Sequence, residues 1–390
     1  MCYNLGVPIL PSPLSAGSLL ELPVQCQEIR NASDFSSLEP EYHQLYARSP
    51  QATLYQSYCW ISNWLHTFAG AQTRPHLITI RKHGRLIGCA PLVMRRPAGM
   101  PFRRLEPIGV LRSDYMDLLL EAGAEQEALA GFERHLSLSR KWDLLDMQQL
   151  PEDSPTLSYF RENQERLGCL VNVQETCPYA PLPKTWEAYL AGLGKKNRYN
   201  VGYYRRLLER DFTLWIGRVS LEDMDVSMEE LFRLHQLRWR KRRLPGALFN
   251  PRVREFHRRV AADLLSSHQL DLYRMDLDGQ TVAMLYCFAE SGRGYYYLGG
   301  FDPAFAKYSV GTVLTAYAIQ QSISRGHTVF DFLRGAEPYK YRWNVQEKLN
   351  YRVEWMRGGL GSRALCTLNQ ATRAIEHRAK LIAHKLERSA

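Results

Sequence analysis

The sequence predicts an α+β protein that uses one plan of strands and helices twice. A hairpin pattern recurs at a fixed spacing along the chain, and each copy is followed by the same series of strand, loop, helix and strand. The length of 390 residues agrees with a duplication, because ordinary domains span ~100 to 200 residues. We therefore expect two domains, each with a mixed, mostly antiparallel sheet flanked by helices.

The repeated hairpins cover residues 76–90 and 271–285. Each segment has the pattern strand, tight turn, strand, and the turns fall on His83-Gly84 and Asp278-Gly279 at equivalent positions. Glycine accepts the positive φ that a two-residue hairpin turn requires. One such similarity could arise by chance, but the ordered series that follows it favours duplication.

The elements that follow the hairpins also correspond. In the first half we predict a strand at 103–109, a helix at 125–139 and a strand at 141–147; in the second half, a strand at 294–300, a helix at 309–325 and a strand at 327–333. Apolar residues at helical spacing predict further helices at 35–48, 58–68, 221–243 and 251–267, with strands at 212–219 and 351–356.

Composition excludes several classes of protein. Hydrophobic residues make up 45% and charged residues 23%, which is typical of a globular fold and excludes disorder, collagen-like repeats and coiled coil. The formal charge of +10 and pI near 9.2 favour anionic partners. No apolar run reaches the ~18 residues of a membrane-spanning helix, and prolines interrupt the apolar N-terminus, so neither a transmembrane segment nor a signal peptide is expected.

Cysteine and histidine spacing argues against a metal site. The eight cysteines include no Cys-x-x-Cys pair and no His-Glu-x-x-His occurs, so reduced cysteines in a cytoplasmic protein and no bound metal are expected. Gly-x-Ser-x-Gly, Walker and dinucleotide fingerprints are also missing from the sequence, which disfavours the commonest hydrolases, NTPases and dinucleotide enzymes.

The start of the helix at 309–325 has the strongest physical signal for a binding site. The sequence Ser309-Val310-Gly311-Thr312 follows a strand that ends at Gly299-Gly300. Small residues at a helix N-terminus let a phosphate approach the unpaired amides there. The alternative is that Ser309 only caps the helix and Gly311 only serves packing.

A second signal is the polar segment after the strand at 327–333. Asp331 lies in an apolar strand, which is costly unless its carboxylate is paired, and Arg334, Glu337, Tyr339 and Lys340 follow it. The alternative is a salt-bridged sheet edge. If the strands at 294–300 and 327–333 are neighbours joined by the helix, both signals belong to one cleft.

Basic clusters are the third signal, at 195–198 with 205–206, at 238–243 and at 252–259. Interleaved aromatic residues such as Tyr199 and Tyr203 could stack on the bases of a nucleic acid. Solvated helix faces explain the same clusters.

Taken together, these segments resemble a known family. The resemblance spans about residues 45–356 and rests on these motifs: Gln56-Ser57-Tyr58-Cys59-Trp60, Gly88-Cys89-Ala90-Pro91-Leu92, Ser113-Asp114-Tyr115, Lys196-Asn197-Arg198-Tyr199-Asn200, Tyr295-Tyr296-Tyr297-Leu298-Gly299-Gly300-Phe301-Asp302, Tyr308-Ser309-Val310-Gly311 and Phe330-Asp331-Phe332-Leu333-Arg334-Gly335 with Tyr339-Lys340. The chain is similar to GNAT-superfamily acetyltransferases of the CelD type, named for a cellulose-biosynthesis protein and related to FemAB-type aminoacyl transferases. The family pattern has proline where this chain has Val310.

The resemblance implies tandem GNAT-like domains. The expected limits are an irregular extension at 1–22, an N-terminal domain at 23–180, a C-terminal domain with the CoA-type site at 181–356 and a basic helix at 357–390. The implied co-substrate is acetyl-CoA or another acyl-CoA, bound by the residues Leu298, Gly299, Gly300, Tyr308, Ser309, Val310, Gly311, Thr312 and Arg334.

The implied reaction moves the acyl group to an amine or hydroxyl of a small-molecule or saccharide acceptor, with a role in polysaccharide or cell-envelope synthesis. Asp331 or Glu337 is the candidate base, and Tyr339 or Lys340 the candidate acid. Two alternatives stay open. One is an aminoacyl-tRNA-dependent transferase on the same fold, and the other is a non-catalytic partner of a polysaccharide synthase whose basic tail contacts anionic lipid.

Overall fold

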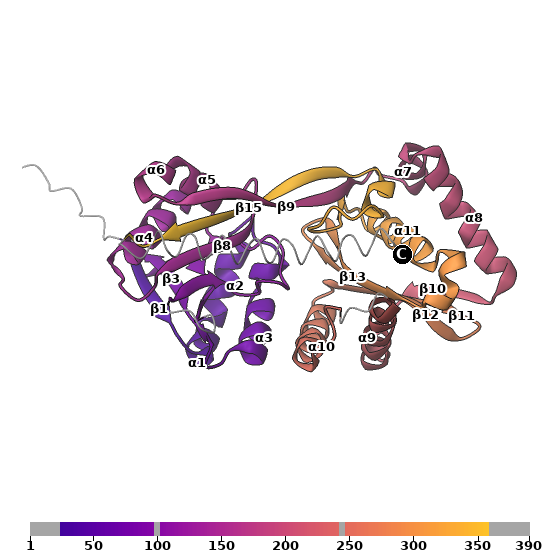
Figure 1. Cartoon of the computed structure of the whole chain (residues 1–390), viewed down its shortest axis with the longest axis horizontal. Helices are drawn as coiled ribbons and strands as arrows, with labels where there is room; N and C mark the ends of the chain where they lie inside the picture. The colour runs from indigo at the N-terminus through magenta and orange to yellow at the C-terminus, as the bar shows by residue number, and fades with distance from the viewer. Residues whose placement is uncertain (1–23, 97–101, 242–245, 359–390) are drawn as a thin grey trace, which may run out of the picture.

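The computed structural model describes residues 24–96, 102–241 and 246–358. The predicted N-terminal extension, most of the predicted basic C-terminal helix and part of the 238–243 cluster lie outside these ranges. The described chain forms two lobes side by side, bridged by two long strands (Figure 1).

The first lobe is built mainly from the first half of the chain. Its elements are β1 (Gln25–Ile29), α1 (Ala32–Ser37), α2 (Glu39–Ala47), the 3-10 turn Leu54–Gln56, α3 (Tyr58–Phe68), β2 (Thr73–Pro75), β3 (Leu77–Lys82), β4 (Arg85–Ala90), β5 (Leu92–Arg95), β6 (Arg104–Pro107), β7 (Leu119–Leu120), α4 (Glu125–Leu138), β8 (Leu144–Pro151), α5 (Pro155–Glu162), α6 (Gln164–Leu167) and β9 (Leu170–Pro181).

The second lobe follows the same plan. Its elements are α7 (Trp186–Gly192), α8 (Lys195–Asp211), β10 (Leu214–Arg218), α9 (Met224–Lys241), α10 (Pro251–Ser266), β11 (Leu270–Leu277), β12 (Gln280–Glu290), β13 (Arg293–Phe301), the 3-10 turn Pro303–Tyr308, α11 (Val310–Ser324), β14 (Val329–Asp331), the 3-10 turn Lys340–Trp343 and β15 (Gln346–Met356).

The duplication is visible in the strand pairing. In each half a first strand pairs antiparallel with a hairpin, β1 with β3–β4 and β10 with β11–β12. Each half also has two parallel strands joined by a helix, β6–α4–β8 and β13–α11–β14. The predicted α+β class and the repeated plan are therefore confirmed, as is the adjacency of the strands on either side of α11.

Several predicted elements differ in their bounds from the structure, and for two of them the physical reason is clear. The helix expected at 35–48 is broken at Leu38, because Pro40 opens α2 and a proline disfavours helical geometry in the residues just before it. The strand expected at 327–333 is only Val329–Asp331, because the chain leaves the sheet after Asp331 and Leu333 takes a left-handed φ of 59°.

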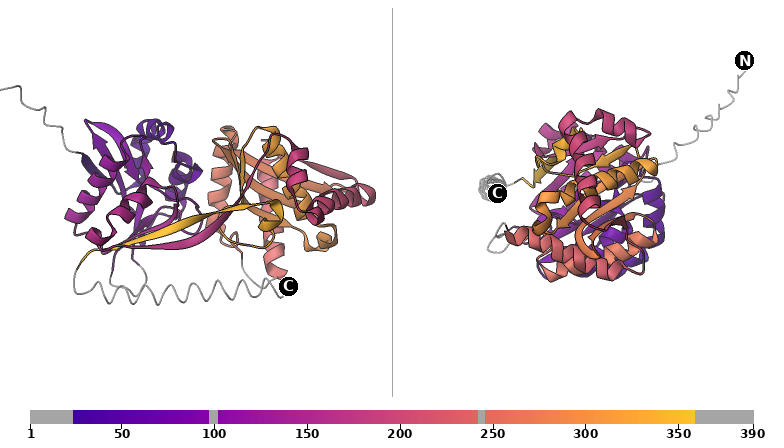
Figure 2. Two further views of the ribbon diagram at one scale, coloured as in Figure 1. Left: turned by 90° about the horizontal axis from the view of Figure 1, so that it is seen from above. Right: turned by 90° about the vertical axis from the view of Figure 1, so that its right-hand side faces the viewer.

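The lobes exchange their last strands. β9, which ends the first half, pairs with β14 of the second, whereas β15, which ends the second half, pairs with β8 of the first. β9 and β15 also pair with each other along most of their length. The result is a sheet of eleven strands that runs through both lobes, with a separate four-stranded sheet in the first lobe (Figure 2).

A shared hydrophobic core also joins the lobes. α3 packs against α10, and the buried Trp60 ring on α3 makes edge contacts with Phe256 and Phe288 of the second half, at centroid distances of 5.0 and 5.9 Å. Aromatic contacts of this kind bury large apolar areas in a defined geometry. The surface between the lobes is therefore packed and fixed, and a site there can use residues of both halves.

Candidate functional site

Two adjacent pockets lie in and beside the second lobe. The first, here called the helix pocket, has a volume of about 430 Å³ and lies between the start of α11, the strands β12 and β13 and the segment 337–343. The second, here called the interlobe pocket, has about 400 Å³ and lies between β13, α10, the segment 332–340 and a loop of the first half at 111–114. Glu337, Tyr339 and Tyr296 line both pockets.

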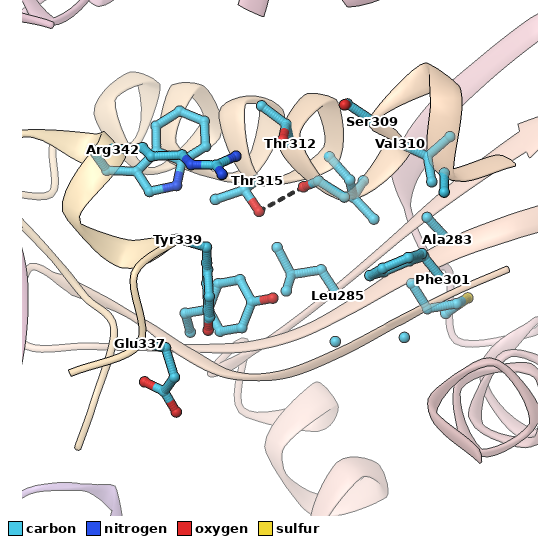
Figure 3. Close-up of a pocket in the computed structure, with 18 of the residues that line it drawn as sticks. Ala283, Leu285, Phe301, Ser309, Val310, Thr312, Thr315, Glu337, Tyr339 and Arg342 are labelled. Carbon is cyan, nitrogen blue, oxygen red and sulfur yellow. Dashed lines mark hydrogen bonds between the residues drawn. The ribbon is translucent and has the colours of Figure 1, made fainter. Parts of the chain in front are cut away.

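The start of α11 forms one end of the helix pocket. Ser309 precedes the helix in a left-handed conformation, and its carbonyl accepts the amides of Thr312 and Val313 at 2.8 and 3.2 Å. Within the described chain, the amides of Val310 and Gly311 donate no hydrogen bond. Figure 3 shows this helix start and Phe301 at one end of the pocket, with Tyr339 and Glu337 toward the other. Two free donors at the positive end of the helix dipole suit an anion.

The pocket exists because β13 and β14 separate. They pair in parallel only as far as Tyr295 and Asp331, and a bulge in β13 leaves Tyr297 without an opposite residue on β12. Bulges redirect a strand and end pairing beside it. Beyond Tyr295 the ladder between β13 and β14 ends, and residues of β13 from Tyr296 onward line the two pockets.

A side chain would meet different neighbours at Gly299 and at Gly300 of β13. A Cβ on Gly300 would lie 2.4 Å from the backbone nitrogen of His235, so this glycine allows α9 to pack closely on β13. A Cβ on Gly299 would lie 2.9 Å from the Tyr296 hydroxyl, in the pocket wall. At Gly311 the nearest atom would be a ring carbon of Phe301 at 3.6 Å, an ordinary contact. Helix packing therefore explains Gly300, whereas internal packing leaves Gly311 unexplained.

Two buried charged side chains hold the segment after β14. Asp331, fully buried, accepts the Tyr115 hydroxyl at 2.9 Å and the Leu333 amide at 2.8 Å, and pairs with Lys348 at 2.9 Å. The Lys340 ammonium donates to the carbonyls of residues 333–335 at 2.8 to 3.1 Å and pairs with Glu337 at 2.8 Å. These bonds fix the segment that presents Glu337 and Tyr339.

The structure brings most of the sequence-predicted residues together, but in three groups. Gly299, Gly300, Ser309, Val310, Gly311 and Thr312 line the helix pocket; Leu298, Arg334 and Lys340 line the interlobe pocket; Glu337 and Tyr339 line both.

Two predicted residues line neither pocket. Asp331 is enclosed by its partners, and Tyr308 is buried with its ring 5.0 Å from Phe212. The expectation that Asp331 faces the cleft differs from this geometry, because its strand ends before the cleft begins.

Several lining residues are not among the candidate site residues of the sequence prediction, although Arg342 and Trp343 belong to its polar segment. Arg342 and Trp343 line the helix pocket, and Arg112, Asp114 and His257 line the interlobe pocket. The motif Ser113-Asp114-Tyr115 was a signal for the loop at 111–114. His257 has no such signal, because it lies on α10 and reaches the site only through packing between the lobes.

Burial sets the protonation of the interlobe pocket. Desolvation raises the pKa of the Asp114 carboxyl, an effect that the nearby Arg334 opposes through an ion pair at 3.4 Å. Desolvation, with the positive charge of Arg112, lowers the pKa of His257 to about 3. The imidazole is therefore neutral near pH 7.

The basic residues of α8 and α10 are only partly engaged in ion pairs. On α10, Arg258 pairs with Glu229 and Arg259 pairs with Glu255. On α8 the cationic residues are exposed; Arg205 pairs with Glu209 and Arg210 with Asp211. The rings of Tyr199 and Tyr203 stack at 5.6 Å. Asn197 and Asn200 of α8 border the helix start through a small pocket with Ser309 and Thr312.

Other features of the described ranges carry fewer functional signals. Six cysteines are free thiols there. No cluster of three or more metal-ligating side chains occurs among the described residues. None of the described helices combines the length and hydrophobicity needed to cross a bilayer.

The comparisons with known families bear on the second lobe. Residues 195–341 match the family model described as an acetyltransferase (GNAT) domain. This range includes α8, the helix start of α11 and the residues shared by both pockets. No curated protein matches the chain.

Solved structures share the fold of nearly the whole chain. The structure of FemX is similar with a TM-score of 0.61 and 12% identity, covering 82% of this chain and 96% of that one. L-PGS from Bacillus licheniformis gives a TM-score of 0.53 at 11% identity, covering 90% and 99%. The C-terminal domain of a putative lysylphosphatidylglycerol synthetase from Agrobacterium fabrum gives 0.50 at 10% identity, covering 85% and 96%. The chain therefore shares its overall fold with these structures, and residues 195–341 of its second half are similar to a GNAT acetyltransferase domain.

Proposed function

We propose that the protein is an acyltransferase that binds an acyl-CoA in the helix pocket and transfers the acyl group to an amine or hydroxyl acceptor in the interlobe pocket. One observation carries this proposal: Tyr296, Glu337 and Tyr339 line both pockets, so two substrates can meet there. The match of residues 195–341 to a GNAT acetyltransferase domain supports the same reaction class.

The helix pocket suits the donor. The free amides of Val310 and Gly311 would bind the CoA pyrophosphate at one end. The pantetheine arm would then run along the separated edge of β13 toward Tyr339, so that the thioester lies near the boundary with the interlobe pocket. Backbone amides at 298–300 are the groups proposed to polarise the thioester carbonyl.

Glu337 and Tyr339 are the proposed catalytic residues. Glu337 takes a proton from the acceptor as its nitrogen or oxygen attacks the thioester carbon. The tetrahedral intermediate collapses, the carbon–sulfur bond breaks, and the thiolate takes a proton from the Tyr339 hydroxyl. Asp331 and Lys340 are positioning residues, because both hold the segment 331–340 through buried hydrogen bonds.

A second candidate donor is an aminoacyl-tRNA. The resemblance to FemAB-type transferases, the fold shared with FemX and the exposed cationic face of α8 beside the helix start favour it. For the acceptor, the resemblance suggests a saccharide or an amine of polysaccharide or cell-envelope synthesis.

Thermal unfolding with and without CoA tests the donor. A ligand that binds only the folded state at 100 times its Kd adds about 2.7 kcal/mol of stability, so CoA should raise Tm by a few degrees. An aminoacyl-tRNA-dependent enzyme should show no shift with CoA. For the chemistry, Glu337→Gln should keep the CoA shift and lose transfer by at least 100-fold. Full transfer by this variant would remove Glu337 from the base role.

A further inference from the structure

The interlobe pocket carries an inference about the acceptor. We infer that the loop at 109–115 of the first half, together with His257 of α10, binds an anionic group on the acceptor. This inference rests on the proposed function, because only a transferase has an acceptor. Its test measures binding alone and does not require acyl transfer.

The loop is built to hold one unusual conformation. Gly109 has a φ of 94°, and a Cβ there would lie 2.0 Å from the Ser113 hydroxyl. The amides of Arg112 and Ser113 both donate to the Gly109 carbonyl at 2.8 Å. Between Gly109 and Arg112, Leu111 has a φ of 80° and is 75% exposed at the pocket rim. A bulky residue at positive φ is strained, and such strain persists only where the surroundings enforce it.

Both lobes enforce this conformation. The buried Trp60 indole donates to the Ser113 hydroxyl at 2.8 Å, and the Gln56 amide donates to the Tyr115 carbonyl. From the second lobe, the Tyr297 hydroxyl donates to the carbonyl of Arg112 at 2.8 Å. The backbone of Arg112 is therefore fixed at the pocket wall before any ligand binds, which lowers the entropic cost of recognition.

The interlobe pocket is lined by one more cationic side chain than carboxylates. Asp114 pairs with Arg334, and Glu337 pairs with Lys340, so each carboxylate that lines the pocket has its own cation. Arg112 has no carboxylate partner within the described chain. Its guanidinium lies over the Phe68 ring at 4.4 Å, and its Nε is buried without a hydrogen-bond acceptor. A half-buried cation of this kind is best satisfied by an anionic ligand.

His257 provides the second, independent observation. Its side chain is 2% exposed and lines the same pocket, and its Nδ1 has no hydrogen-bond partner in the described structure. The ring is held by Phe256, Tyr286 and Tyr297 at centroid distances of 5.0 to 5.7 Å. Buried polar nitrogens are rarely left unpaired. A neutral imidazole held in this way can donate one N–H to an anion that Arg112 neutralises.

The acceptor class follows from this arrangement. It has its nucleophilic amine or hydroxyl near Glu337 and a carboxylate or phosphate near Arg112 and His257. Apolar and aromatic walls formed by Val253, Tyr297 and Phe332 suit the part of the acceptor between the two polar ends. An amino acid and an aminosugar phosphate share this chemistry.

Matched pairs of compounds distinguish the two sources of the anion. Calorimetric titrations without CoA compare glucosamine 6-phosphate with glucosamine, and L-glutamate and L-lysine with their α-amides. We expect at least one charged member to bind ten times more tightly than its neutral partner. Arg112→Gln should remove that preference, and His257→Phe should weaken the charged member at least threefold. The control Arg259→Gln removes one positive charge from an exposed face of α10 and should change nothing.

Two outcomes overturn the inference. One is equal binding of every charged compound and its neutral partner by the wild-type protein. The other is a charge preference that survives Arg112→Gln. The proposed function fails separately, if CoA gives no thermal shift; full transfer by Glu337→Gln would remove only the base role of Glu337. If the anion preference holds without a CoA effect, the interlobe pocket remains an acceptor site for a different donor.

Discussion

Replacing Gly311 by aspartate tests the donor site most directly, because the change should separate binding from stability. Gly311 is the second residue of α11 and has no positive φ, and a Cβ there meets only the Phe301 ring at an ordinary 3.6 Å. A carboxylate in the first turn of a helix is favourable by about 0.3 to 1 kcal/mol. Gly311→Asp should therefore fold with unchanged or slightly higher Tm.

The same carboxylate should strongly oppose a phosphate at the helix start. Two like charges about 5 Å apart repel by roughly 3 kcal/mol at an effective dielectric constant of about 20. That energy corresponds to about 100-fold in Kd. Gly311→Asn is the matched control, because it has the same size and no charge, so it reports the steric effect alone.

Calorimetric titration of CoA into both variants provides the measurement. We expect the Kd of Gly311→Asp to exceed that of Gly311→Asn by 30-fold or more at low ionic strength, with a smaller ratio at high salt because screening weakens the repulsion. Equal affinities of the two variants, within threefold, would show that the pyrophosphate does not lie on these amides.

Three further predictions concern stability, measured by urea unfolding. Gly300→Ala should lower the free energy of unfolding by about 3 kcal/mol, because the added Cβ would lie 2.4 Å from a backbone nitrogen of α9. Gly311→Ala should lower it by under about 1 kcal/mol, because the Cβ there would make only an ordinary contact. Lys340→Met should lose at least ~3 kcal/mol, because three carbonyls lose their buried donor. His257→Phe should make the stability less sensitive to acid. The pKa of His257 is about 3 in the folded protein against an ordinary 6.5, so the unfolded chain takes up the proton first as the pH falls. Between pH 7.5 and pH 5 the free energy of unfolding of wild type should therefore fall by about 2 kcal/mol relative to the variant.

Contrary results would be equally informative. A stable Gly300→Ala would mean that α9 can move away from β13. A stable Lys340→Met would show that the segment after β14 is held by other contacts. Parallel pH profiles for wild type and His257→Phe would show that the imidazole is solvated in the folded state.

Local patterns predicted the helix start of the candidate site well. Ser309 and Gly311 form a local signal at the beginning of an apolar helix, and α11 begins within one residue of the predicted start. The order strand, helix, strand suggested that β13 and β14 could be neighbours, and the structure pairs them in parallel. Both inferences depend on residues that are close in sequence.

The role of Asp331 could not be predicted in the same way. Sequence order indicated an acid near the cleft, but the partners that enclose its carboxylate, Tyr115 and Lys348, come from a loop of the first half and from an exchanged strand. Such contacts depend on how the lobes pack, which no local pattern specifies.

The sequence alone determined the duplicated α+β plan, the helix start with its small residues and the polar segment that follows the next strand. Those features depend on hydrophobic periodicity, turn residues and backbone geometry, all of which are local. Only the tertiary structure decided that β9 and β15 are exchanged and that Arg112 and His257 meet Glu337 in one pocket. Long-range packing places those groups together, because the shared aromatic core around Trp60 fixes one lobe against the other.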